Sequence, residues 1–184
     1  MPTKQDAIIL LNESVKSESL LRHCYSVAFA MQSYANKYEP DKKEIWFITG
    51  LLHDFDYEIF PTIPEHCIEG AKILKEKGFS DEIIEAILGH ANYSGVPRIS
   101  NMAKCLFAVD ELSGLILALA HVRPGKFEAM DADSVKKAMK KKGFASAINR
   151  DDIELGIKEL GVSKEEHFNF VVNALREHAG ELGF

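Results

Sequence analysis

Four histidines and two aspartates stand out in this chain as candidate ligands for divalent metals. They lie between positions 23 and 110: His23, His53, Asp54, His66, His90 and Asp110. Imidazole nitrogens and carboxylate oxygens together hold divalent cations that activate water. The adjacent His-Asp pair is a weak signal alone, because such a dipeptide also arises by chance. Whether the six form one site depends on the elements that position them.

Helical periodicity places two of the histidines on apolar faces. Apolar residues recur at spacings of three and four between about Ser19 and Tyr38, which predicts a long amphipathic helix. His23 lies on or beside the buried face of that helix. His90 follows Ile83 and Ile87 at helical spacing. Both imidazoles are therefore expected to point inward.

Asp110 gives the strongest physical hint of a metal. It follows Leu106 and precedes Leu117 in a helix expected from about Ser100 to Ala120. A carboxylate in such an apolar stripe is costly unless it is paired or bound to a metal. Each candidate also has an ordinary explanation: a lone His on an apolar face is more often a core residue, Asp54 could end a helix, and Asp110 could pair with Arg or Lys. One metal cluster would explain all six with a single cause.

Helical signals recur along the chain, and strand signals do not. Capping pairs predict helix starts at Thr3, Asp41, Asp151 and Ser163. The segment from Ile45 to Leu52 is apolar nearly all round, which suits a central helix better than an isolated strand. We predict an all-α bundle forming a single domain over residues 1–184, with a metal-binding core at about 18–120 and C-terminal helices at about 131–180.

Composition limits the classes of function. The chain has 184 residues, 46% of them hydrophobic, and a net charge of -6. This charge argues against a general nucleic-acid binder, although it does not exclude a small phosphorylated substrate. Three widely spaced cysteines (Cys24, Cys67 and Cys105) suggest no disulfide framework. With no signal peptide or membrane span evident, we expect a cytoplasmic protein with Leu112–Val122 as a buried helix.

In their order and local context, the six residues resemble the HD superfamily of metal-dependent phosphohydrolases. The resemblance covers about residues 18–120 and includes Gly70-Ala71 after His66 and the Ile-x-x-His pattern ending at His90. It implies that His23, His53, Asp54 and Asp110 hold one metal. It also implies that His66 and His90, with Asp54 as a bridge, hold a second. Iron or manganese is favoured over nickel, cobalt, zinc or magnesium, and Asp54 and His53 would be the catalytic residues.

The expected substrate is small, phosphorylated and nucleotide-like. The stretch from His90 to Asp110 resembles HD hydrolases that cleave dinucleoside polyphosphates, but Glu111-Leu112-Ser113-Gly114 departs from their pattern. Arg123 and Lys126, with Arg22 as a further candidate, are predicted to bind phosphate unless they are solvated surface charges. The basic run Lys136–Lys142 is either a solvated helix face or the rim of a pocket.

Two other functions remain open at this stage. Some HD proteins with a two-metal ligand set are di-iron oxygenases, so oxygen-dependent chemistry is the first alternative. The second is a non-catalytic module that binds a nucleotide or a metal. The intact set of six candidate ligands favours an enzyme over this module.

Overall fold

The computed structural model describes residues 2–184, and this part of the chain consists of helices and loops without a β-strand. The all-α prediction is confirmed. Two short 3₁₀ helices, η1 (Pro40–Lys42) and η2 (Asn92–Ser94), lie between longer elements. The α-helices are α1 (Lys4–Ser14), α2 (Glu18–Tyr38), α3 (Lys43–Leu52), α4 (Glu65–Glu76), α5 (Asp81–His90), α6 (Asn101–Val122), α7 (Ala132–Lys140), α8 (Arg150–Leu160) and α9 (Lys164–Glu177).

Local capping chemistry explains several helix starts and corrects two predictions. Thr3 forms a capping box at α1, and the Ser163 side chain caps α9. The start predicted at Asp41 is wrong, because this residue lies within η1 and no side chain caps α3. The start predicted at Asp151 is also wrong. Asn149 precedes it and accepts hydrogen bonds from the first backbone N–H groups of α8, so this amide takes the capping role.

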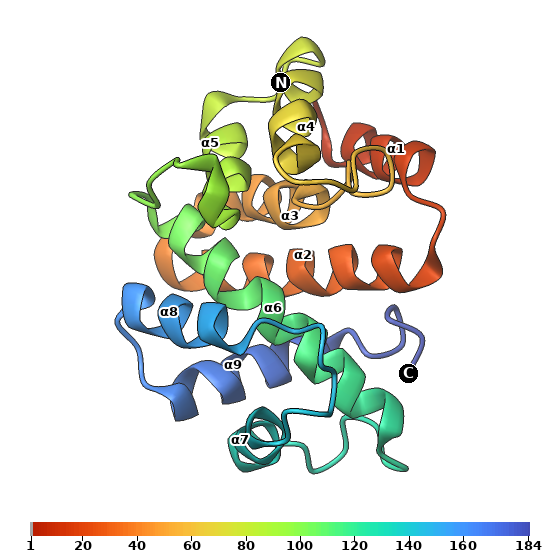
Figure 1. Cartoon of the computed structure of the whole chain (residues 1–184), viewed down its shortest axis with the longest axis vertical. Helices are drawn as coiled ribbons and strands as arrows, with labels where there is room; N and C mark the ends of the chain where they lie inside the picture. Colours follow the sequence, from red (N-terminus) through yellow and green to blue (C-terminus); the bar gives the residue numbers. More distant parts are fainter. Residues whose placement is uncertain (1) are drawn as a thin grey trace.

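Helices α2, α3 and α6 form the centre of the structure. Figure 1 shows α6 crossing the molecule obliquely, with α5 near its start and α8 and α9 beside it, and these three helices all contact it. Helix α3 is buried from Trp46 to Leu52, as expected for a central helix. A Cβ atom at Gly50 would lie only 2.8 Å from Cα of Ala28 on α2. Helices α2 and α3 therefore meet with their backbones in close contact.

Helix α6 is apolar because it belongs to the core. By length and composition it would suffice to cross a membrane, but 61% of its 18-residue apolar window is buried inside the structure. The predicted buried segment Leu112–Val122 forms its C-terminal half. Helix α6 therefore offers one continuous support for groups on α2, α5 and α8.

A buried histidine joins the C-terminal helices to this centre. His167 on α9 is fully buried, and its Nε2 donates to the carbonyl oxygen of Ala108 at 2.9 Å. Its Nδ1 then accepts from the hydroxyl of Tyr34 at 2.6 Å. Burial lowers the pKa of His167 to about 4. This neutral imidazole is a core residue that connects α9, α2 and α6.

Candidate metal centre

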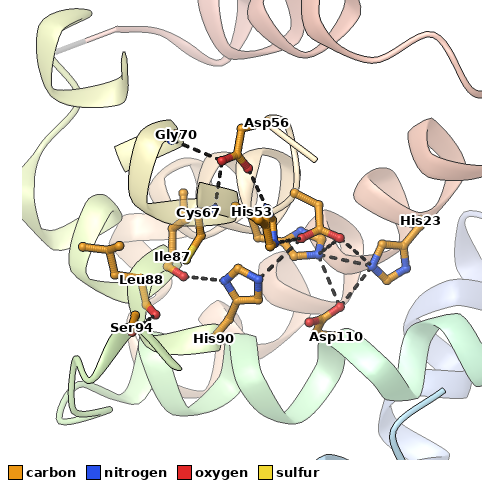
Figure 2. Close-up of polar contacts among 12 residues, drawn as sticks. His23, His53, Asp56, Cys67, Gly70, Ile87, Leu88, His90, Ser94 and Asp110 are labelled. Carbon is orange, nitrogen blue, oxygen red and sulfur yellow. Dashed lines mark hydrogen bonds and ion pairs between the residues drawn. The ribbon is translucent and has the colours of Figure 1, made fainter. Parts of the chain in front are cut away.

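The six candidate ligands come from five neighbouring helices or their ends. His23 lies in α2, Asp110 lies in the middle of α6, and His90 is the last residue of α5. His53 and Asp54 directly follow α3, where the chain leaves the helix. Figure 2 shows His23, His90 and Asp110 pointing from different elements toward His53. Residues that are up to 87 positions apart in the sequence thus meet at one place.

His23, His53 and Asp110 form the first ligand group. Nε2 of His23 lies 3.0 Å from Oδ1 of Asp110 and 3.2 Å from Nε2 of His53. Nε2 of His53 lies 3.3 Å from the same oxygen of Asp110. The side chain of Asp110 is 18% exposed, because an open cavity reaches it. Two imidazoles and a carboxylate therefore face a common point beside solvent.

Asp54, His66 and His90 form the second group. Oδ1 of Asp54 lies 3.2 Å from Nε2 of His66 and 3.4 Å from Nε2 of His90. Its other oxygen, Oδ2, lies 3.4 Å from Nε2 of His53 and 3.9 Å from Nε2 of His23. One carboxylate thus directs one oxygen to each group. A carboxylate in this position could contribute one oxygen to a metal ion in each group.

Hydrogen bonds on the far side of three rings fix their orientation. Nδ1 of His53 lies 2.8 Å from the carbonyl oxygen of Gly50, and Nδ1 of His90 contacts the carbonyl oxygen of Ile87. A carbonyl oxygen only accepts, so Nδ1 carries a proton in both rings, and Nε2 presents a lone pair when the ring is neutral. Nδ1 of His66 faces a carboxylate oxygen of Asp56 in the same way. Such outer hydrogen bonds select the tautomer that binds a metal.

The resulting donor set fits divalent cations. Imidazole nitrogens and carboxylate oxygens converge at 3.0–3.9 Å, and their lone pairs repel one another unless a proton or a metal ion lies between them. In each group, the ligand atoms of all three residues lie within 4.8 Å of one another. Histidine and carboxylate ligands suit iron, manganese, zinc and related ions. Each group could therefore hold one metal ion.

Comparison with known proteins agrees with this geometry. The family model for the HD domain matches residues 20–115, which is just over half of the 184 residues. The chain belongs to the HD domain family. All six candidate ligands lie in the matched region. The family resemblance and the placement in the superfamily of metal-dependent phosphohydrolases are thus confirmed.

Ribonuclease Y of Oleidesulfovibrio alaskensis is a relative of this HD domain. The two are 30% identical over 133 residues, which cover 72% of this chain and 24% of that protein. The chain therefore spans about a quarter of the length of this curated relative. No solved structure matches the chain.

Asp56 supports the HD site, a role that was not predicted from the sequence. Its side chain is fully buried, and Oδ1 lies 3.0 Å from Nδ1 of His66. Its other oxygen accepts from the backbone N–H groups of Cys67 at 2.9 Å and Gly70 at 3.1 Å. Figure 2 shows Asp56 above His53, His90 and Asp110, on the side of Cys67 and Gly70. The only sequence signal for it is a second aspartate two residues after Asp54.

We expect Asp56→Asn to weaken metal binding by the second group by about 10- to 100-fold. The amide oxygen can still accept from Cys67 and Gly70, but the amide nitrogen then faces Nδ1 of His66. This contact favours a proton on Nε2, the atom that should bind the metal. Titration of the metal-free protein with Mn²⁺ measures the change. Asp133→Asn, at an exposed carboxylate on α7, is the matched control, and equal affinities in the two variants would contradict the prediction.

The charges of the HD site favour a bound cation. Burial lowers the pKa of His53, but Asp54 and Asp110 more than compensate and raise it well above its ordinary value. Burial raises the pKa of Asp54, yet the neighbouring imidazoles of His53, His66 and His90 hold it well below its ordinary value. The pKa of Asp110 is lowered for the same reason. Both carboxylates are therefore anionic and attract positive charge.

An open cavity of about 570 Å³ leads to the ligands. Among the residues that the structure describes, no lysine or arginine lines it, whereas Glu111 and Asp152 add acidic groups to Asp54 and Asp110. Burial and the charge of Asp110 raise the pKa of Glu111 to about 7. The uncharged polar residues at the walls are Tyr57, Asn92, Tyr93 and Asn149. Beyond the ligands, this cavity offers polar groups without basic side chains.

The cations predicted to bind phosphate lie elsewhere. The guanidinium of Arg123 donates to the carbonyl oxygen of Glu128 at 3.0 Å, and Nζ of Lys126 lies 5.9 Å from the ring centre of Phe184. Neither residue lines the cavity beside the ligands, and Arg22 lines an adjacent one. The substrate-binding role of Arg123 and Lys126 therefore stays a prediction, without a direct contact in its support.

The basic run of the sequence borders a separate cavity. A cavity of about 330 Å³ is lined by Arg150 and by three lysines of this run: Lys136, Lys140 and Lys142. The guanidinium of Arg150 also donates to carbonyl oxygens of the preceding loop, including that of Ile148 at 3.1 Å. The basic run thus rims a pocket, and that pocket is distinct from the one beside the metal ligands.

Proposed function

We propose that this chain is a metal-dependent phosphohydrolase that cleaves a phosphoester or phosphoanhydride bond of a small, nucleotide-like substrate. The observation that carries this proposal is the position of Asp54, with one oxygen toward each group of ligands. The ligand set suits two divalent ions, and we favour iron or manganese. We also propose that the protein acts in the cytoplasm and does not bind membranes.

Different side chains of the site would have different roles in this reaction. Divalent ions held in such a site lower the pKa of bound water and stabilise charge on a phosphoryl oxygen. Asp54 and His53 would act as ligands at the reacting centre. Asp152 accepts from the amides of Asn92 at 3.0 Å and Asn149 at 2.7 Å, which orients both groups at the cavity wall. Each amide keeps a second N–H that can donate to a substrate oxygen.

The name of the relative, Ribonuclease Y, raises RNA as another substrate. A long polyanion is normally held by lysines and arginines that neutralise its phosphates. The net charge of -6 and the lack of basic side chains among the described residues of the cavity favour a small substrate instead. A screen should therefore include a short RNA beside phosphorylated metabolites.

We expect chelation to abolish phosphate release and Mn²⁺ or Fe²⁺ to restore it. The reason is that the described cavity residues include no serine, threonine or cysteine that could replace metal-activated water as the nucleophile. The measurement combines elemental analysis of the purified protein with a phosphate-release screen before and after chelation. Release that continues at full rate in the metal-free protein would contradict the proposed function. If a nucleotide stabilised the metal-loaded protein but yielded no product, a binding module would be favoured.

An HD-type oxygenase is the second candidate function. The observation in its favour is the lining of the cavity beside the metal ligands. The described residues of this lining provide hydroxyl, amide and carboxylate groups but no lysine or arginine for a phosphate. A substrate rich in hydroxyl groups would suit such walls. The test is to load the protein with iron under anaerobic conditions and measure substrate turnover on addition of oxygen. Oxygen-dependent turnover without phosphate release would favour the oxygenase.

A further inference from the structure

A second open cavity continues directly from the metal-site cavity. Its volume is about 710 Å³, and the two cavities share four lining residues: His23, Tyr57, Gly114 and Ile148. One of these residues, His23, is itself a candidate metal ligand. The second cavity is therefore an extension of the candidate active site.

The walls of this extension differ chemically from those of the first cavity. Its surface is mostly carbon, although Ser17, Ser19, Glu58 and His121 also line it. The apolar side chains belong to α2, α6, the loop before α8 and the end of the chain: Leu20, Leu117, Ala118, Ala147, Ile148 and Phe184. Arg22 adds its stem to this wall, with its guanidinium 5.7 Å from the ring centre of Phe184. A concave apolar surface next to a few convergent polar groups is typical of a small-molecule site.

Helix α6 connects the two cavities along one face. One face of α6 leads away from the metal ligands, and this track consists of residues at helical spacing: Asp110, Gly114, Leu117 and Ala118. From Asp110 to Ala118 this track rises by about 12 Å. A Cβ atom at Gly114 would lie 2.8 Å from Cδ1 of Ile148, so a larger residue would crowd the junction. Glycine at this position therefore lets Ile148 pack closely against α6 where the two cavities meet.

The charges of the first cavity indicate what kind of group can extend into the second. With no lysine or arginine among its described lining residues, the first cavity has no basic site for phosphates beyond the one at the metal ligands. Contact with the apolar walls of the extension then adds affinity that the polar groups of the first cavity cannot supply. We propose, resting on the proposed function, that the substrate is a phosphoester whose organic part includes an apolar group, and that this group occupies the extension.

Binding of alkylphosphonates to the Mn²⁺-loaded protein tests the proposal separately from catalysis. Calorimetric titration with methyl-, propyl- and pentylphosphonate should show Kd falling about threefold to fourfold for each added methylene, and on the order of 100-fold from methyl to pentyl. A Kd that does not change with chain length, or no binding at any length, would overturn the proposal. Phosphate release from the metabolite screen would still decide the proposed function by itself.

Two variants locate the effect within the extension. Ala118→Phe fills the cavity from α6, and Leu20→Asn makes its α2 wall polar, so each should reduce the ratio of methyl to pentyl Kd to below about 5. Leu155→Phe adds the same ring to α8 at an exposed residue that lines neither cavity, and should keep the wild-type ratio. If both cavity variants fold and retain the wild-type ratio, the apolar part binds elsewhere and the proposal is wrong.

Discussion

Asp54→Asn should reduce metal-dependent phosphate release by at least about 100-fold and lower the metal content of the purified protein. Asp54 directs one oxygen to the group with His53 and the other to the group with His66. Asparagine retains the shape of the side chain but loses the negative charge, and its nitrogen cannot replace a carboxylate oxygen as a ligand. The substitution therefore weakens both groups at once.

A matched variant separates this effect from the loss of a carboxylate elsewhere on the protein. Asp151→Asn removes a carboxylate at an exposed position in the first turn of α8, and Asp151 lines neither of the cavities beside the ligands. It should bind metal and release phosphate at the wild-type level. Circular dichroism of both variants confirms that the helices are retained. Full activity in a folded Asp54→Asn protein would refute the assignment of the metal centre.

Much of the helical framework could be predicted because it depends on local patterns. The spacing of apolar residues that predicts a helix from about Ser19 to Tyr38 agrees with α2, and the apolar segment at Ile45–Leu52 lies in the buried α3. The candidate ligands were recognisable for the same reason. Asp110 stands in an apolar stripe, where an unpaired carboxylate is costly.

The errors and omissions arise where distant or competing groups decide the outcome. Asp151 matches a local capping pattern, but Asn149 precedes it and takes the cap. Asp56 forms its hydrogen bonds with residues 10 to 14 positions away, so no short motif reveals its role. The shape of the extension depends on the contact between Ile148 and Gly114. These two residues meet only because the loop before α8 packs on α6.

Gly50→Ala should lower the free energy of unfolding of the metal-free protein by about 1–3 kcal/mol. The added Cβ atom would lie 2.8 Å from Cα of Ala28 and 2.9 Å from the carbonyl oxygen of Val27. These are backbone atoms of a buried helix, so they cannot rotate away as a side chain would. Helices α2 and α3 must move apart, and urea denaturation of the metal-free protein measures the cost.

The same substitution should also weaken metal binding by at least about tenfold, because the close contact positions ligands on both helices. His23 lies on α2 with Ala28, whereas His53 follows α3 and its Nδ1 bonds to the carbonyl oxygen of Gly50. Separating the helices lengthens the approach of the two Nε2 atoms. Gly180→Ala, where a Cβ atom meets nothing within 4 Å, is the control for both measurements. If Gly50→Ala lost stability but bound Mn²⁺ with wild-type affinity, the contact would hold the fold together without setting the geometry of the metal ligands.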